Sequence, residues 1–140
     1  MISLDTNILS AYLNPRDVQF GVAQSNLARV ANKHRLLVCG AVYSELLAAP
    51  FSSESGLDEF LEDYAIAIDW QTEESIWREA GRAFRAYSQL RQKYAQPAPR
   101  RILADFLIGA HALERGLTLL TLDSRLYTSS FPKLQLEIIS

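Results

Sequence analysis

The chain has few of the residues that build disulfide frameworks or metal sites with nitrogen and sulfur ligands. Its 140 residues include one cysteine, one methionine and two histidines. The single cysteine, Cys39, cannot form an internal disulfide, which favours a reducing compartment. It lies in an apolar run with no evident base near it in the sequence, so we interpret it as a small core residue and not as a nucleophile.

Long apolar runs are also absent. No stretch reaches the roughly 18 apolar residues that a membrane span requires. The N-terminus lacks a charged leader followed by a long apolar region, which is the pattern of a signal peptide. We therefore expect a cytoplasmic protein that makes no contact with a membrane.

Neither sign of charge is in large excess, but the charges are unevenly distributed. The net charge is −2. Eight acidic residues and no Lys or Arg fall between Glu54 and Trp77, whereas seven basic residues and one acidic residue fall between Arg78 and Arg101. The basic segment is either a solvated helix face with ion pairs or a local phosphate-binding surface, because phosphate contacts need only local positive charge. The candidate RNA-binding residues are Arg78, Arg82, Arg85, Arg100 and Arg101.

Apolar runs of strand length alternate with helical patterns, which predicts an α/β fold. Hydrophobic residues make up 49% of the chain and charged residues 21%, as in ordinary globular proteins, and the length suits a single domain over residues 1–140. Strands are expected at 1–4, 36–39, 65–68, 117–122 and 135–139. Helices are expected at 7–13, 18–33 (capped by Asp17), 41–49, 55–64 (capped by Ser55), after Thr72, and between Pro99 and Gly116. This order predicts a three-layer α/β/α architecture with a mainly parallel sheet of about five strands.

The helix after Thr72 has two distinct stripes. Its apolar residues recur at helical spacing and are expected to face the core; they are Ile76, Trp77, Ala80, Phe84 and Tyr87. Three arginines of the basic segment form the other stripe.

Four acidic residues stand at the ends of apolar runs: Asp5, Glu45, Asp105 and Asp123. In an α/β fold the carboxyl ends of the strands and the following helix starts lie on one edge of the sheet, so these four can converge there. Two unit charges about 5 Å apart repel by roughly 3 kcal/mol at an effective dielectric constant near 20. Such a cluster needs protons or cations, and oxygen ligands without matching His or Cys suit Mg²⁺ or Mn²⁺.

Each acid also has a purely structural interpretation. Asp5 can cap the helix that follows it, Asp105 can complement a helix dipole, and Asp123 can hydrogen-bond the turn after its strand. Glu45 can be a partly exposed helix residue. His111 is a weak acid–base alternative, because six residues of helix separate it from Asp105 by about 600°, which leaves the two side chains on different faces.

The chain resembles the PIN-domain ribonucleases, particularly the toxin half of VapBC-type toxin–antitoxin pairs. The segments that carry the resemblance keep their order and spacing over nearly the whole chain; they are Ile2–Leu9, Val42–Leu47, Ala104–Ala112 and Leu119–Asp123. The resemblance implies that Asp5, Glu45, Asp105 and Asp123 are the catalytic, metal-binding acids. It also implies that Thr6 and Asn7 support the first acid and that Thr121 lies near the last.

The resemblance further implies an activity and partners. The reaction is metal-assisted hydrolysis of RNA phosphodiesters with Mg²⁺ or Mn²⁺. The partners are an RNA substrate, a VapB-like antitoxin that blocks the acidic site, and a second copy of the chain in a homodimer.

Three alternatives remain open at this point. A haloacid-dehalogenase-like phosphatase also has an aspartate after its first strand, but it needs a second Asp where this chain has Asn7. A flavodoxin-like receiver domain would use Asp69 as acceptor and would want a Lys after its fifth strand, which is missing. A catalytically silent PIN-like module would bind RNA or protein without cleaving it.

Overall fold

The fold is built on one parallel sheet that reverses its strand order at β1. The structure is a computed structural model that describes residues 1–49, 52–93 and 101–138. The sheet order is β3-β2-β1-β4-β5, and every described pairing is parallel. The strands are β1 (Ile2–Leu4), β2 (Leu36–Cys39), β3 (Ile66–Asp69), β4 (Thr118–Thr121) and β5 (Leu136–Ile138).

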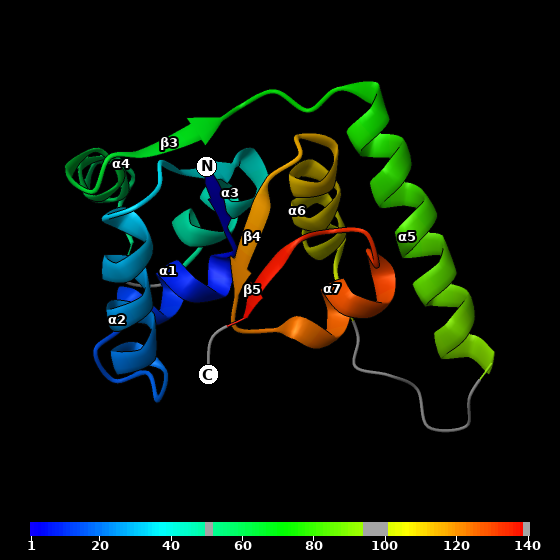
Figure 1. Cartoon of the computed structure of the whole chain (residues 1–140), viewed down its shortest axis with the longest axis horizontal. Coiled ribbons are helices and arrows are strands. Elements are labelled where there is room, and N and C mark those ends of the chain that lie inside the picture. Colours follow the sequence, from blue (N-terminus) through cyan, green and yellow to red (C-terminus); the bar gives the residue numbers. More distant parts are fainter. Residues whose placement is uncertain (50–51, 94–100, 139–140) are drawn as a thin grey trace.

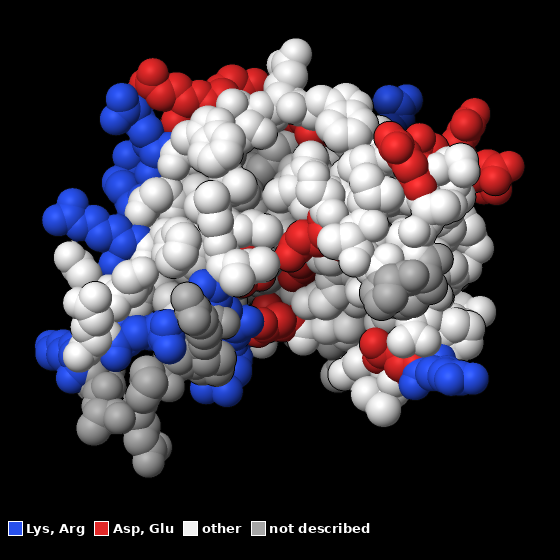
Figure 2. Space-filling model, turned by 180° about the vertical axis from the view of Figure 1, so that it is seen from behind, with Lys and Arg blue, Asp and Glu red and all other residues white. Residues whose placement is uncertain are grey.

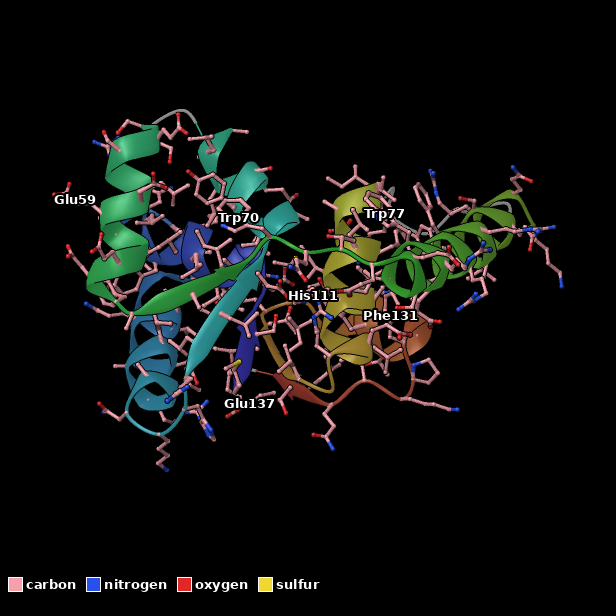
Figure 3. The ribbon with its side chains drawn as sticks, turned by 90° about the horizontal axis from the view of Figure 1, so that it is seen from above. Glu59, Trp70, Trp77, His111, Phe131 and Glu137 are labelled. Atoms are coloured by element: carbon pink, nitrogen blue, oxygen red, sulfur yellow. The ribbon has the colours of Figure 1, made fainter. Side chains whose placement is uncertain are left out.

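Helices cover both faces of this sheet. They are α1 (Thr6–Tyr12), α2 (Phe20–Ala31), α3 (Gly40–Leu47), α4 (Glu54–Asp63), α5 (Glu74–Lys93), α6 (Leu103–Glu114) and α7 (Ser124–Ser130). Figures 1 and 3 show α1, α2 and α4 on one side of the sheet and α5, α6 and α7 on the other. Right-handed crossovers explain this division, because the chain moves one way from β1 to β3 and the opposite way from β3 to β5. The predicted three-layer α/β/α architecture is confirmed.

The reversal places a crevice at the carboxyl ends of β1 and β4. In open α/β sheets this switch point is where ligands bind, because the connections from the two central strands leave in opposite directions. The same edge carries the first turns of α1 and α3, which follow β1 and β2 almost without a loop. The receiver-domain alternative is wrong, since that fold has the strand order 2-1-3-4-5.

The core forms where the central strands meet α6. All residues of β1 and β2 are buried, as expected for strands covered on both faces. Helix α6 is apolar on most sides and buries Phe106, Ile108 and Ala110 among others. It ends before Gly116, whose φ of +66° is the left-handed conformation that glycine adopts at a helix end, as the sequence predicts.

Several local predictions are wrong in detail. Helix α4 is capped by Ser53 and not by Ser55, because the Ser53 Oγ accepts the hydrogen bond of the Gly56 N–H at 3.1 Å. Helix α2 begins at Phe20, since Asp17 accepts the Gln19 N–H within the preceding turn. Helix α7 was not expected. The predicted break at Gln96–Pro99 lies outside the described residues.

Helix α5 has the two predicted stripes, except that one residue predicted to face the core is half exposed. Ile76 and Ala80 are fully buried, but Trp77 is 50% exposed. Trp77 lies 100° around the helix from Ile76, at the edge of the apolar stripe, so its ring extends past the packed face. Among the described helices none is both long and apolar enough to cross a bilayer.

Candidate functional site

Asp5 lies at the centre of the crevice and is buried to 5% exposure. It follows β1 directly, and its backbone N–H donates to the Leu120 carbonyl of β4 at 3.0 Å. Its carboxylate does not cap α1, so the capping interpretation is wrong. Instead the Asp5 Oδ2 accepts a hydrogen bond from the Thr121 hydroxyl at 2.8 Å.

Thr121 and Asn7 tie the end of β1 to the end of β4. The Thr121 Oγ1 accepts hydrogen bonds from the Asp123 N–H at 2.9 Å and the Asn7 side-chain amide at 3.3 Å. The Asn7 Oδ1 in turn accepts the Leu122 N–H at 3.2 Å. The Thr121 hydroxyl therefore uses its one donor on Asp5 and its two acceptor positions on other partners, which fixes the Asp5 carboxylate in orientation. Asn7 acts structurally here, at the position where a phosphatase of the dehalogenase type needs a second carboxylate.

Glu45 and Asp105 approach the crevice from α3 and α6. The Glu45 Oε1 accepts a hydrogen bond from the Thr6 hydroxyl at 2.6 Å, which links α3 to the start of α1. The Asp105 Oδ2 accepts the Ile102 N–H at 3.0 Å, so Asp105 satisfies a free donor at the start of α6. The expected role of Asp105 at its helix start is thus present, alongside its position at the crevice.

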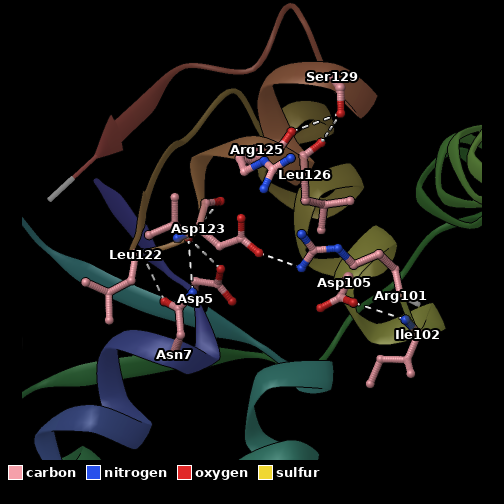
Figure 4. A network of polar contacts seen from close by, with 11 residues as sticks. Asp5, Asn7, Arg101, Ile102, Asp105, Leu122, Asp123, Arg125, Leu126 and Ser129 are labelled. Carbon is pink, nitrogen blue, oxygen red and sulfur yellow. Dashed lines mark hydrogen bonds and ion pairs between the residues drawn. The ribbon is translucent and has the colours of Figure 1, made fainter. Parts of the chain in front are cut away.

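Asp123 is held by an arginine. Its Oδ2 lies 2.5 Å from the Arg101 Nη1, and the side chains are 31% and 20% exposed. Asp123 makes no side-chain cap on α7, and the turn after β4 is closed by Thr121 instead. Figure 4 shows Asp5, Asp105, Asp123 and Arg101 around one space. Figure 2 shows acidic atoms in a hollow at the middle of this face, with basic side chains along one flank.

The acids share an electrostatic environment. Desolvation by burial raises the pKa of Asp5 to about 6, against the hydrogen bonds it accepts, and the Asp105 charge raises it further. Burial and the same Asp105 charge also raise the pKa of Glu45, although the hydrogen bond from Thr6 opposes them. The Asp105 carboxylate therefore repels the carboxylates of both Asp5 and Glu45 across the crevice.

Tyr127 is a site residue that the sequence reasoning missed. It is 1% exposed, and its hydroxyl hydrogen-bonds to the Asp5 carboxylate. Burial and the nearby charge of Asp5 raise the pKa of Tyr127, so it stays a neutral donor. Tyr127 lies one helical turn after Asp123, and that spacing would have identified it if α7 had been predicted.

The donor set fits a hard divalent cation, but the side chains are turned toward protein partners. Within the described residues no three His, Cys, Asp or Glu side chains are grouped so as to hold a metal ion together. Glu45 is paired with Thr6, Asp105 with the Ile102 N–H, and Asp123 with Arg101. Oxygen-only ligands suit Mg²⁺ or Mn²⁺. A bound cation would also offset the Asp105 charge that contributes to the raised pKa of Asp5. For a cation to bind, these hydrogen-bonding partners have to release the carboxylate oxygens.

The predicted RNA-binding arginines separate into two groups. Arg78 and Arg82 form ion pairs on α5 with Glu74 at 2.9 Å and Glu79 at 2.8 Å, in agreement with the solvated-face interpretation. Arg85 is exposed on the same helix, whereas Arg101 belongs to the acidic crevice. Arg100 lies outside the described residues. An RNA contact by any of these residues stays a prediction.

Asp69 ends β3 at the same sheet edge but belongs to a separate network. Its Oδ2 lies 2.8 Å from the buried His111 Nε2 and 3.0 Å from the Arg115 Nε. Burial raises the pKa of Asp69, but the hydrogen bonds from His111 and Arg115 outweigh it and hold the pKa at about 2. His111 therefore faces Asp69 and takes no part in the acidic crevice.

Comparisons with known proteins agree with this architecture. The family profile described as PIN domain matches residues 2–131. The chain is similar to the solved structure of VapBC2 from Rickettsia felis bound to a DNA fragment from their promoter, with 24% identity, a TM-score of 0.69 and coverage of 100% of both chains. It is also similar to VapBC-1 from nontypeable Haemophilus influenzae, with 21% identity, a TM-score of 0.67 and coverage of 99% of this chain and 98% of that one.

A third similar structure is VapC20 of Mycobacterium tuberculosis, described as a sarcin-ricin loop cleaving toxin. The identity is 15%, the TM-score 0.64, and the match covers 96% of this chain and 99% of the other. No curated protein matches the chain. At these identities the solved structures establish the likeness in fold.

Proposed function

The chain belongs to the PIN-domain family, and from this premise we propose that it is a Mg²⁺- or Mn²⁺-dependent endoribonuclease whose catalytic acids are Asp5, Glu45, Asp105 and Asp123. The observation that carries the proposal is the buried Asp5 carboxyl at the switch point of the sheet, with the Asp105 charge close enough to raise its pKa. Folding alone does not require such repulsion, and a cation bound between these carboxylates would relieve it.

The four acids would hold the metal, and their neighbours would orient them. A bound divalent ion would neutralise the scissile phosphate and lower the pKa of an attacking water. Thr121 and Tyr127 fix the Asp5 carboxylate, and Thr6 fixes that of Glu45. Arg101 neutralises Asp123 in the absence of metal, so it has to release that carboxylate when a cation takes its place.

The toxin role of a VapBC-type pair is part of this proposal. Support comes from solved complexes described as VapBC from Rickettsia felis and Haemophilus influenzae, which share the fold over almost the full length of this chain. The description of VapC20 as a toxin that cleaves the sarcin-ricin loop supports RNA as the substrate class. We propose a VapB-like antitoxin that covers the acidic crevice, and self-association of this chain as a homodimer in the cytoplasm.

One observation favours a catalytically silent module as the second candidate. The described acids do not form a three-ligand metal group, and the Asp123 carboxylate forms an ion pair with Arg101. If the arginine never yields, the crevice binds no metal and the domain acts only through its surface.

The deciding experiment is cleavage of total RNA by purified, partner-free protein, with Mg²⁺, with Mn²⁺ and in EDTA. Metal-dependent cleavage is expected, and Asp5→Asn should abolish it. Glu59→Gln is a matched control, because Glu59 is an exposed acid on α4, away from the crevice. Equal cleavage in EDTA rules out the metal mechanism. No cleavage of any RNA, whether or not the protein binds metal, supports the silent module.

The toxin role has its own test. A small DNA-binding protein encoded by the adjacent upstream reading frame should copurify with the chain and inhibit its nuclease activity. Expression of the chain alone should arrest growth, and Asp5→Asn should relieve the arrest. A nuclease that causes no growth arrest and retains no such partner contradicts the toxin role while leaving the enzymatic proposal intact.

A further inference from the structure

A cavity beside the acidic crevice is lined by apolar side chains together with two arginines and several hydroxyl groups. It lies between α5 and α7, which contact each other (Figure 1), and has a volume of about 470 Å³. Its polar lining residues are Tyr87, Arg101, Ser124, Arg125, Thr128 and Ser129, and the remaining two are leucines. No acidic side chain is among the described residues that line it, although the chain as a whole is acidic.

Arg125 is the available cation of this cavity. It is exposed near the start of α7, and its guanidinium forms no ion pair with any of the described residues, unlike Arg78, Arg82 or Arg115 elsewhere on the protein. An arginine fork presents several donors in one plane, which matches the oxygens of a phosphate group.

Arg101 joins the cavity to the acids. Its Nη1 pairs with the Asp123 Oδ2, whereas its Nε is buried and has no acceptor among the described residues. The pairing with Asp123 thus leaves part of the guanidinium unsatisfied. Figure 4 shows the side chains of Arg101 and Arg125 beside Asp5, Asp105 and Asp123.

The hydroxyl groups differ in what they can offer a ligand. The Ser129 hydroxyl already donates to the Arg125 carbonyl at 2.9 Å and the Leu126 carbonyl at 3.2 Å within α7. Ser124 directly follows Asp123, and Thr128 is exposed one turn later. Both can donate a hydrogen bond to a phosphate oxygen.

We propose that this cavity is a binding subsite for a backbone phosphodiester of the RNA strand, next to the scissile phosphodiester that the four acids would bind through a metal. Arg125 is its main charge, Ser124 and Thr128 add neutral donors, and Arg101 stands at its border with the acids. The inference rests on the proposed ribonuclease function and deepens it, because it names how the strand is held beside the reacting group. Phosphate recognition by these side chains is independent of base identity.

The test measures the affinity of a labelled single-stranded oligoribonucleotide in EDTA, over a range of salt concentrations. The protein carries Asp5→Asn, so that no cleavage occurs. Adding Arg125→Ala should lower the slope of log affinity against log salt by about 0.7, the value for one phosphate contact on a single strand. A slope change of that size corresponds to about fourfold weaker binding at roughly 0.15 M salt.

Two further variants control the result. Arg125→Lys keeps the charge and should keep most of the slope. Arg35→Ala removes an exposed arginine just before β2, at the opposite edge of the sheet, and should leave both slope and affinity unchanged. An excess of inorganic phosphate should compete only weakly, because the strand makes more than one contact.

The outcomes separate this inference from the proposed function. If Asp5-intact protein cleaves RNA with metal but Arg125→Ala leaves the slope unchanged, the subsite is wrong and the nuclease stands. If Arg125→Ala lowers the slope but no RNA is ever cleaved, the subsite stands and the nuclease proposal fails. The absence of measurable RNA binding at low salt overturns the subsite. So does the finding that Arg125→Ala weakens the binding of a partner protein and leaves RNA binding unchanged.

Discussion

At the scale of the residue, the buried carboxyl of Asp5 sets the properties of the crevice. Its pKa is raised to about 6 because burial disfavours the charged form more strongly than Thr121 and Tyr127 stabilise it. The ordinary value in an unfolded chain is 3.8. The folded state therefore binds this proton more tightly, and the metal-free protein loses stability as the pH rises from about 4 to about 6.

We predict that Asp5→Asn stabilises the metal-free protein at pH 7 by about 1 to 3 kcal/mol. The rise of the Asp5 pKa from 3.8 to about 6 corresponds to roughly 3 kcal/mol of destabilisation that the amide avoids. The amide also weakens one hydrogen bond, which reduces this gain. At pH 4 the wild-type carboxyl is protonated in the fold, so the two proteins should unfold almost alike. Urea unfolding in EDTA at both pH values measures this difference.

The same variant should respond little to Mg²⁺. A metal that binds only the folded state adds about 1.4 kcal/mol at ten times its Kd. Wild-type protein and the Glu59→Gln control should both show that gain, and Asp5→Asn should not. A variant that is less stable at pH 7 and keeps the full Mg²⁺ response would make Asp5 a structural residue and remove the metal site proposed here.

Arg101 is the second residue on which the chemistry depends, because it competes with a cation for Asp123. We predict that Arg101→Gln raises the affinity for Mn²⁺ and at the same time weakens RNA binding. Calorimetric titration with Mn²⁺ and RNA binding in EDTA measure the two effects separately. Arg35→Gln is the control, since Arg35 is an exposed arginine just before β2, at the opposite edge of the sheet. Weaker Mn²⁺ binding by Arg101→Gln would mean that the arginine organises the acids and does not compete for them.

At the scale of the element, α6 packs so closely against the end of α7 that a glycine is required. A Cβ added at Gly109 would lie 2.6 Å from the Phe131 Cδ2 and 2.9 Å from its Cζ. Phe131 is 1% exposed and belongs to the core, so a displaced ring has to push against other buried side chains. Because α6 carries Asp105 and α7 follows Asp123, this contact sets the separation of two of the acids.

We predict that Gly109→Ala destabilises the protein by about 1 to 3 kcal/mol, as overpacking does in other cores. Gly81→Ala on α5 is the matched control. A Cβ there meets nothing within 4 Å, so the better helix propensity of alanine should stabilise the protein by about 0.5 to 1 kcal/mol. Thermal unfolding of both variants measures the contrast. If Gly109→Ala is neutral, the α6–α7 contact does not constrain the crevice.

The elements were largely predictable from the sequence, and the long-range contacts were not. The strands are short apolar runs, and Asp5, Glu45, Asp105 and Asp123 stand close to element ends, so both follow from local pattern. Helix α7 was missed because its seven residues are rich in hydroxyls and bury only two side chains. Tyr127 was missed with it. The pairing of Arg101 with Asp123 could not be read from the sequence, because it joins residues 22 positions apart through the packing of separate elements.

At the scale of the whole molecule, the net charge of −2 provides no general attraction for RNA. Binding has to come from local surfaces, and the described protein offers two of them: the cavity with Arg125 and the outer stripe of α5 with Arg82 and Arg85. Arg82 is partly neutralised by Glu79, whereas Arg85 forms no ion pair with a described residue. Arg85 is two residues from the cavity-lining Tyr87, about 200° around the helix, so its side chain leaves α5 on the side away from the cavity.

This arrangement predicts that the length of the RNA decides which arginines matter. A trinucleotide can occupy the crevice and the cavity only, so Arg125→Ala should weaken its binding while Arg82→Ala/Arg85→Ala should not. A longer strand can also follow α5, and then both changes should flatten the salt slope, by about 0.7 for each phosphate that is no longer neutralised by an arginine. Because the two surfaces do not touch, their effects should add in the triple variant. Salt titrations with RNA of graded length, in EDTA and with Asp5→Asn throughout, measure this.

If the α5 variant binds long RNA with an unchanged slope, its arginines are ordinary solvated residues, and the strand is held by the crevice and the cavity alone.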